Sequence, residues 1–107
     1  MKNERLRGHL DALLLSILEA GPAHGYEVVS ELRRRSGGEF DLPEGTVYPA
    51  LHRLERQGLL ASAWDMHAGR RRRMYRVTEA GVAARSAASS EWRRFSAGVN
   101  AVLGVVS

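Results

Sequence analysis

Residues 42–60 have the sequence LPEGTVYPALHRLERQGLL. Val47, Leu51 and Leu54 occur at i, i+4 and i+7, the spacing that places them on one side of an α-helix. The other side carries hydrogen-bond donors and cations that a small core excludes, namely Thr46, Tyr48, His52, Arg53 and Arg56. A helix with an apolar back and a basic front is suited to a nucleic-acid groove. We therefore expect the rest of the chain to support this helix.

Pro49 leaves the start of this helix open. Proline is tolerated in the first turn of a helix, where its missing N–H would have no partner anyway. The helix therefore begins either near Thr46, with Thr46 as its cap, or near Glu44 with a kink at Pro49. The sequence does not choose between these two starts.

Length and composition indicate one small domain. The chain has 107 residues, of which 44% are hydrophobic, so the core is thin and an oligomer interface would add buried area. The absence of cysteine excludes disulfides and thiolate metal sites. No signal-peptide pattern opens the chain, and the apolar tail 99–106 is far shorter than the roughly 20 residues that span a bilayer. A soluble, cytoplasmic protein with no membrane association is expected.

The excess positive charge is confined to one segment. The net charge is +4, with 16 basic and 12 acidic residues. Residues 44–76 contain seven arginines against Glu44, Glu55 and Asp65, a difference of four, so the remainder balances at nine against nine. Localised charge of this kind is typical of a phosphate-binding surface. The alternative is an ordinary solvated surface.

Two helices are expected before residue 42. The first spans 8–20, and its broad apolar stripe suggests burial against its own domain and against a second copy; the alternative is a plain core helix. The second spans 24–36, with Tyr26, Val29 and Leu32 inward and Val28 flanking. The cations at 33–35 lie in its last turn, where the helix dipole favours them, so we interpret them as structural. Residues 39–42 alternate polar and apolar and predict a short strand.

The segments 59–64 and 73–78 are strand-like and are joined by a polar link, 65–72, with a basic tip at 67–71. Two strands are not stable alone in water, so this hairpin must lie on the helical core as a wing. Thr78 is expected to cap a last helix that begins at Glu79.

The last helix carries an apolar stripe with spacings of 3, 4, 3 and 4, the pattern of a helix–helix seam. Its members are Trp92, Phe95, Val99, Val102 and Val106, with Leu103 alongside. Two heptads are fewer than a free-standing coiled coil needs. We expect the stripe to meet a partner subunit; the alternative is that it folds back on its own domain.

These elements predict a mainly α protein with a small β-wing. Residues 1–78 form a winged helix-turn-helix domain and residues 79–107 a C-terminal dimerisation helix. The four histidines show no metal-ligand spacing, and the chain has no nucleophile, P-loop or dinucleotide motif. We therefore predict no enzyme activity, metal or cofactor.

Three segments carry a family resemblance: GHLDALLLSILEAGPAHGYEVVSEL (8–32), LPEGTVYPALHRLERQGLL (42–60) and GRRRRMYRVTEAG (69–81). Together they resemble the PadR family of bacterial transcriptional regulators, in its subgroup with one short C-terminal helix. The resemblance implies a homodimer joined by its first and last helices, which represses transcription at an inverted-repeat operator. Pro43 stands where many relatives have Ser, so the side-chain cap is lost there.

The resemblance also implies a ligand. Short-tailed members similar to this chain can bind flat, hydrophobic or cationic small molecules at the dimer interface, and in some of them a Trp of the last helix lines the site. Trp92 occupies the matching position. The alternative is that Trp92 is ordinary interface packing.

We predict that a twofold dimer places two copies of the 42–60 helix in successive major grooves, roughly 34–36 Å apart. Arg53 is expected to bind guanine, and the wing arginines to bind phosphate or enter a minor groove. The predicted DNA contacts are Tyr26, Thr46, Tyr48, His52, Arg53, Arg56, Arg70, Arg71, Arg72 and Arg73. The predicted dimer contacts are Leu10, Leu13, Leu14, Ile17, Phe95, Val99, Val102, Leu103 and Val106.

Two other functions are compatible with the sequence. A winged-helix module that binds protein would use the last-helix stripe for docking, although it has no need for four arginines on the wing. A nonspecific architectural DNA binder is permitted by the charge alone, although His52 and Arg53 on an exposed helix face argue against it.

Overall fold

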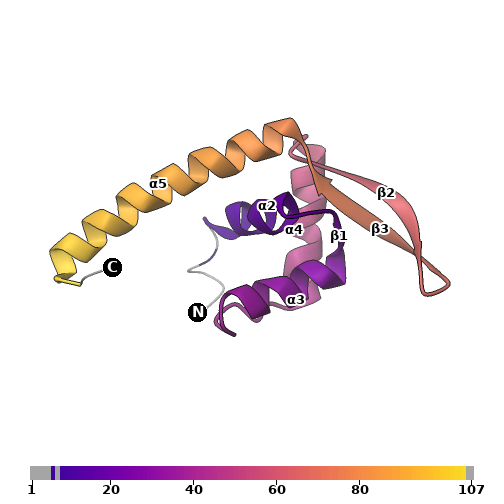
Figure 1. Cartoon of the computed structure of the whole chain (residues 1–107), viewed down its shortest axis with the longest axis horizontal. Helices are drawn as coiled ribbons and strands as arrows, with labels where there is room; N and C mark the ends of the chain where they lie inside the picture. Colours follow the sequence, from indigo (N-terminus) through magenta and orange to yellow (C-terminus); the bar gives the residue numbers. More distant parts are fainter. Residues whose placement is uncertain (1–5, 7, 106–107) are drawn as a thin grey trace.

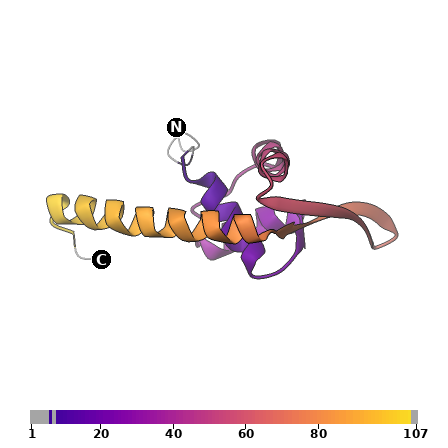
Figure 2. The same cartoon turned by 90° about the horizontal axis from the view of Figure 1, so that it is seen from above.

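The computed structural model describes residue 6 and residues 8–105. Its main elements are α2 (Leu10–Glu19), β1 (Ala23–His24), α3 (Gly25–Arg35), α4 (Glu44–Arg56), β2 (Leu60–His67), β3 (Arg70–Val77) and α5 (Glu79–Leu103). Helices α2, α3 and α4 form a cluster, and the β2–β3 hairpin and α5 extend from it in opposite directions (Figures 1 and 2). This is the predicted architecture of a mainly helical protein with a small sheet.

The core forms where the three helices meet the base of the sheet. Val47, Leu51 and Leu54 of α4 are fully buried, which confirms the apolar side predicted from their spacing. The remaining large core residues come from α2, α3, the loop before α4 and the two long strands: Leu14, Leu15, Ile17, Leu18, Val28, Leu32, Leu42, Leu60 and Tyr75.

Helix α3 faces the core differently from the prediction. Val28, expected to flank the core, is fully buried with Leu32, whereas Tyr26 and Val29 are only half-buried. Val28 and Leu32 are four residues apart and therefore share one side of the helix. Tyr26, two residues before Val28, is directed instead toward the wing. In the last turn Arg34 and Arg35 bind Glu31, at 2.8 and 2.9 Å, which agrees with a structural role.

Helix α4 begins at Glu44, so the earlier of the two predicted starts is correct. Pro43 precedes the helix in an extended conformation and provides no side-chain cap. Its carbonyl accepts hydrogen bonds from the amides of Thr46 and Val47, at 3.0 and 3.2 Å. Pro49 lies inside the helix and cannot donate to the carbonyl of Gly45. Because Gly45 is exposed, water can satisfy that carbonyl.

The predicted strand at 39–42 is wrong. This segment is a loop, anchored by the buried side chain of Leu42 and not by a strand ladder. The third strand is β1, which pairs antiparallel with β3 through Ala23↔Tyr75 and His24↔Met74. The sheet order is β1-β3-β2, so the start of α3 is joined directly to the hairpin.

The hairpin, here called the wing (residues 60–77), is longer than predicted. Strand pairing continues from Leu60↔Val77 to His67↔Arg70, so most of the expected polar link is strand. The turn consists of Ala68 and Gly69, with φ of 54° and 77°. Positive φ at both central residues gives a turn whose twist matches that of the strands.

Helix α5 starts as predicted. The Thr78 hydroxyl accepts a hydrogen bond from the Gly81 amide at 3.1 Å and donates one to the Gly58 carbonyl at 2.7 Å. Gly81 packs against the chain so closely that a Cβ there would overlap the Leu59 carbonyl. Further along, the guanidinium of Arg85 reaches Ser16 and Glu19 of α2. The second half of α5 stands clear of the helical cluster (Figure 2).

The predicted interface residues fall into four groups. Leu14 and Ile17 are buried in the protomer's own core, which removes them from an interface because a partner cannot reach them. Leu10 and Leu13 are half-buried, and Phe95, Val99, Val102 and Leu103 are exposed on α5, Val102 to 87%. Val106 lies outside the described residues.

Candidate nucleic-acid interface

A hollow of about 450 Å³ lies between the start of α3, the exposed side of α4 and the wing. The lining comprises His24, Gly25 and Tyr26 from the start of α3, Tyr48 and His52 from α4, and Trp64, Arg71, Arg72, Arg73 and Tyr75 from the wing. Six of the ten predicted DNA contacts are thereby brought to one place. The hollow combines aromatic rings with three cations, which suits an anionic partner.

Gly25 allows α3 and α4 to approach each other. The ring of Tyr48 lies directly against this glycine, and a Cβ at position 25 would overlap the ring. Burial, and then the carboxylate of Glu44, raise the pKa of the Tyr48 phenol. The phenol therefore keeps its proton at neutral pH and can donate a hydrogen bond to a phosphate oxygen.

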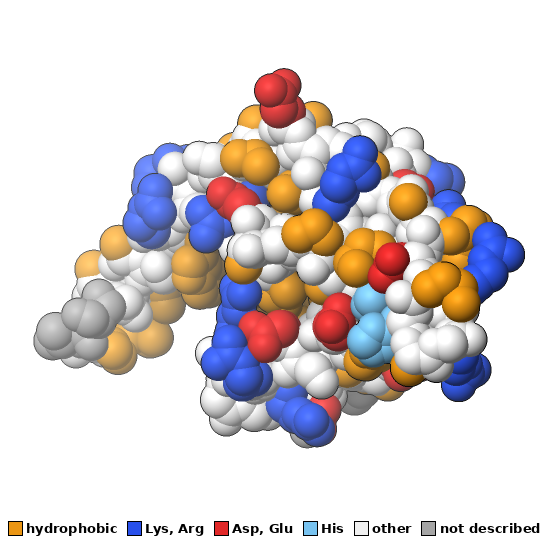
Figure 3. Space-filling model, turned by 45° about the vertical axis from the view of Figure 1, so that its right-hand side comes forward, with side chains coloured by type: hydrophobic (Ala, Val, Ile, Leu, Met, Phe, Trp, Pro, Cys, Tyr) orange, Lys and Arg blue, Asp and Glu red, His pale blue; other side chains and the backbone are white. Residues whose placement is uncertain are grey.

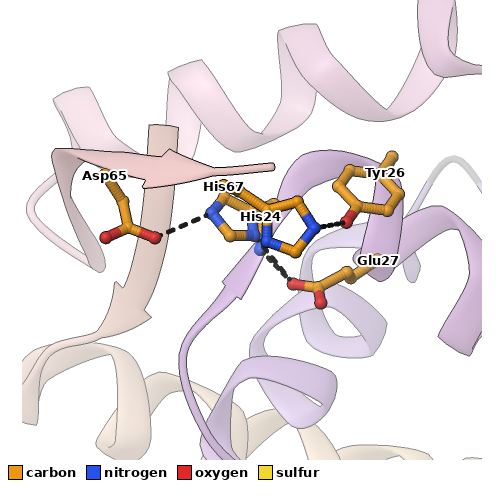
Figure 4. Close-up of polar contacts among 5 residues, drawn as sticks. All are labelled: His24, Tyr26, Glu27, Asp65 and His67. Carbon is orange, nitrogen blue, oxygen red and sulfur yellow. Dashed lines mark hydrogen bonds and ion pairs between the residues drawn. The ribbon is translucent and has the colours of Figure 1, made fainter. Parts of the chain in front are cut away.

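A polar cluster joins the start of α3 to the wing (Figure 4). His24 is only 3% exposed; its Nδ1 lies 3.1 Å from Glu27 and its Nε2 3.2 Å from Asp65 of β2. The Tyr26 hydroxyl lies 2.9 Å from Nε2 of His67 near the wing tip. Figure 3 shows histidine side chains beside acidic ones on the face turned forward. These contacts fix the angle of the wing relative to α3.

The wing arginines are held over aromatic rings. The guanidinium carbons of Arg71 and Arg73 lie 4.4 and 4.8 Å from the ring centroid of Trp64, and that of Arg72 lies 4.5 Å from the centroid of Tyr26. Within residue 6 and residues 8–105, no carboxylate forms an ion pair with Arg70, Arg71, Arg72 or Arg73. Their positive charge is therefore available to an external anion.

Arg53 does not line the hollow. Its guanidinium donates two hydrogen bonds, both 2.8 Å, to the two carboxylate oxygens of Asp11 on α2, and these bonds raise the pKa of Arg53. This differs from the expectation that Arg53 offers the same bidentate fork to guanine, because one fork cannot hold both partners. Arg53 instead ties α4 to α2 while this pair is intact.

The other predicted DNA contacts occupy less central positions. Thr46 is half-buried in the first turn of α4, Arg56 is exposed in its last turn, and Arg70 is exposed beside the wing turn. None of these three lines the hollow. Arg56 and Arg70 add exposed positive charge to α4 and to the wing.

Four residues that line the hollow were not predicted as contacts from the sequence: His24, Gly25, Trp64 and Tyr75. Alternation along the wing would have revealed Trp64 if the turn had been placed at 68–69, because Trp64 then lies opposite Arg73. No sequence pattern links His24 to Asp65, which are 41 residues apart.

Trp92 lies away from this hollow, on the second half of α5. It is 50% exposed, and its ring centroid lies 5.1 Å from that of His9 and 5.8 Å from that of Phe95. It therefore belongs to an aromatic group at the apolar stripe, as its spacing suggested. Its proposed ligand role stays a prediction.

The described part of the chain has neither a candidate membrane span nor a candidate metal site. No helix there is both long enough and apolar enough to cross a bilayer. Among the same residues, no three acidic or histidine side chains gather in a way that would hold a metal ion.

A helix-turn-helix core with a β-hairpin wing and a long final helix defines the winged helix-turn-helix class. Similarity to known proteins assigns the chain to one family within this class. Residues 14–87 match the model of the transcriptional regulator PadR-like family, and the chain belongs to that family. Transcriptional regulators are not a class of enzyme.

Individual relatives agree with this assignment. The chain is similar to a PadR family transcriptional regulator from Eggerthella lenta, with 37% identity and a TM-score of 0.82, covering 94% of this chain and 86% of that one. It is also similar to a transcriptional regulator from Clostridium thermocellum, with 30% identity and a TM-score of 0.84, covering 91% and 95%. The transcriptional regulator Rv3488 of Mycobacterium tuberculosis is 48% identical over 61 residues, 57% of this chain and 54% of that protein.

Proposed function

We propose that this protein is a homodimeric repressor that binds an inverted-repeat operator through α4 and the wing. One observation carries the proposal: arginines without carboxylate partners in the described structure lie on the wing beside the exposed side of α4, around one hollow. A surface of this kind is suited to the phosphate backbone of a duplex. A regulator that binds chromosomal DNA works in the cytoplasm, where we expect this protein.

The residues divide by role. Thr46, Tyr48 and His52 on α4 approach base edges and nearby phosphates in the major groove. Tyr26 contacts the DNA backbone. The arginines at 70–73, together with Arg56, bind phosphate or enter the minor groove. Arg53 supports DNA binding indirectly, because its ion pair with Asp11 holds α4 in place.

The dimer forms through the stripe on α5, supplemented by Leu10 and Leu13 of α2. Phe95, Val102 and Leu103 are more than half exposed in one protomer, and a second copy would remove this apolar surface from water. Twofold symmetry then presents two α4 helices about one helical turn, roughly 34–36 Å, apart.

Binding of a small molecule at this dimer interface releases the protein from DNA. A flat hydrophobic or aromatic cation next to Trp92 would change the separation of the two α4 helices. Such a ligand shifts the equilibrium only by its difference in affinity between the DNA-bound and free forms. Titrating aromatic cations into a Trp64→Phe variant, in which Trp92 is the one tryptophan, should quench the emission; an unchanged emission would contradict the ligand proposal.

The DNA proposal is tested by comparing two duplexes at fixed salt: the DNA upstream of the protein's own gene and a scrambled duplex of equal length. Tight binding to the first and weak binding to the second, at a solution mass of two chains, is expected. Equal affinities would indicate a nonspecific architectural protein. Binding to neither duplex would favour a protein-interaction module.

A further inference from the structure

Trp64 shares one face of the wing with two of the arginines. It lies opposite Arg73 in the strand register, and Arg71 lies two residues from Arg73 on the same strand. Paired residues of antiparallel strands project to the same side, as do residues two apart along one strand. All three side chains line the hollow beside α4.

The indole of Trp64 is in contact with both guanidinium groups but is not needed for the core. The guanidinium carbons lie 4.4 and 4.8 Å from the ring centroid, within the range of a cation–π interaction. Trp64 itself is 58% exposed. A large aromatic side chain that is mostly exposed and contacts two cations is better explained by those cations than by packing.

Two cations held at one ring repel each other unless an anion lies close. No carboxylate of the described residues forms an ion pair with either arginine, so an external anion is the partner that would relieve the repulsion. Arginine also has many rotamers, and ordering it on binding costs free energy. A guanidinium that is already stacked on a ring has lost most of its rotamer freedom before the anion binds, so binding costs less free energy.

We propose that Trp64 is a positioning residue for DNA binding. Its ring holds Arg71 and Arg73 so that their guanidinium groups form a ready-made pair of donors for backbone phosphates. This proposal rests on the proposed function, because duplex DNA is the polyanion that fits both α4 and the wing. Trp64 acts through the arginines and need not contact the bases.

The test measures binding of a labelled upstream duplex and a scrambled duplex between about 50 and 200 mM NaCl. Trp64→Ala should weaken binding roughly tenfold on both duplexes, on the order of the ordering cost of two long side chains. Its slope of log affinity against log salt should stay unchanged, because the arginines still reach phosphate. Trp64→Phe should restore most of the affinity, since phenylalanine also presents a ring face.

Two variants give matched controls. Met66 lies on the same face of β2, opposite Arg71, and is 64% exposed, so Met66→Ala removes a similarly exposed apolar side chain and should leave affinity unchanged. Arg71→Ala removes a phosphate contact and should lower the salt slope by about one. Thermal unfolding of each variant verifies that the fold is intact.

A measurement without DNA tests the stack itself. The side-chain protons of Arg71 and Arg73 should show upfield ring-current shifts in the NMR spectrum, and these shifts should vanish in Trp64→Ala. Their absence in the unmodified protein would overturn the proposal, whatever the protein binds.

The remaining outcomes separate this proposal from the function on which it rests. Equal affinities of Trp64→Ala and Met66→Ala, with strong binding by the unmodified protein, would overturn the role of Trp64 alone. A reduced salt slope in Trp64→Ala would overturn positioning in favour of lost phosphate contacts. No DNA binding by the unmodified protein at any salt would overturn the proposed function and this proposal with it.

Discussion

Arg53 of α4 and Asp11 of α2 form a bidentate pair, with both hydrogen bonds 2.8 Å long. The pair connects the helix proposed to enter the major groove with the helix proposed to help form the dimer. Because α2 also contacts Arg85 of α5 through Ser16 and Glu19, α2 connects α4 with the long final helix. We therefore expect a shift of α5 at the proposed dimer interface to act on α4 through α2.

A double-mutant cycle of Asp11→Ala and Arg53→Ala should reveal a coupling free energy of unfolding of about 0.5–1 kcal/mol. The pair is little more than half-buried, with Arg53 42% exposed, so solvent screening keeps the value small. Urea unfolding of the four proteins supplies the cycle. Strict additivity of the two substitutions would show that the pair contributes nothing in solution.

Gly25→Ala should destabilise the fold by about 1–3 kcal/mol, the usual range for overpacking, because the added methyl overlaps the Tyr48 ring. Thermal unfolding measures the loss. Gly45→Ala is the matched control: nothing lies within 4 Å of its Cβ position on α4, so it should be neutral or stabilising by up to about 1 kcal/mol. If Gly25→Ala in a Tyr48→Ala background costs as much as in the unmodified chain, the overlap is not the cause.

Glu31 should titrate at unusually low pH. Hydrogen bonds from Arg34, and then from Arg35, lower the pKa of this carboxyl from 4.5 to about 2. A lowered pKa means that these contacts stabilise α3 fully above pH 4.5 and are lost as pH falls from there toward 2. Carbon-13 NMR of the carboxyl group should show a midpoint near the lower value. In Arg34→Gln the midpoint should rise toward the ordinary value; an unchanged midpoint would remove Arg34 as the main cause.

Val102→Glu should convert a dimer into a monomer with unchanged helical content. Val102 is 87% exposed in the protomer, so a charge there costs the single chain little, whereas an unpaired charge inside a helix–helix interface is strongly unfavourable. Mass measurement by light scattering tests this. Ala97→Glu, on the opposite side of α5, should leave the mass unchanged; a dimeric Val102→Glu would place the interface elsewhere.

The elements of this fold follow largely from local sequence. The spacing of Val47, Leu51 and Leu54 specifies the buried side of α4, and the structure buries all three. Thr78 predicts the start of α5 because its hydroxyl is the natural partner of an amide left free in the first turn. Such features depend on neighbours within one or two turns, and the chain order already supplies those neighbours.

The features that the sequence did not predict correctly depend on contacts with distant segments and on packing. The two residues of β1 are too few to show a period, and their strand geometry comes from pairing with β3. The wing was predicted too short because its outer half has little core to cover, so the apolar alternation stops before the strands do. Pro49 is accepted inside α4 because the exposed Gly45 carbonyl can bind water, which depends on how the helix is packed.

The buried side of α4, the segment where positive charge is concentrated and the family indicated by the motifs could all be read from the sequence. The tertiary structure alone decided the partners of the polar groups: Arg53 with Asp11, His24 with Asp65, and Arg71 and Arg73 with Trp64. The physical reason is that burial follows from periodicity along one helix or strand. A hydrogen bond or cation–π contact depends instead on two side chains meeting in space, which distant segments achieve only after the chain has folded.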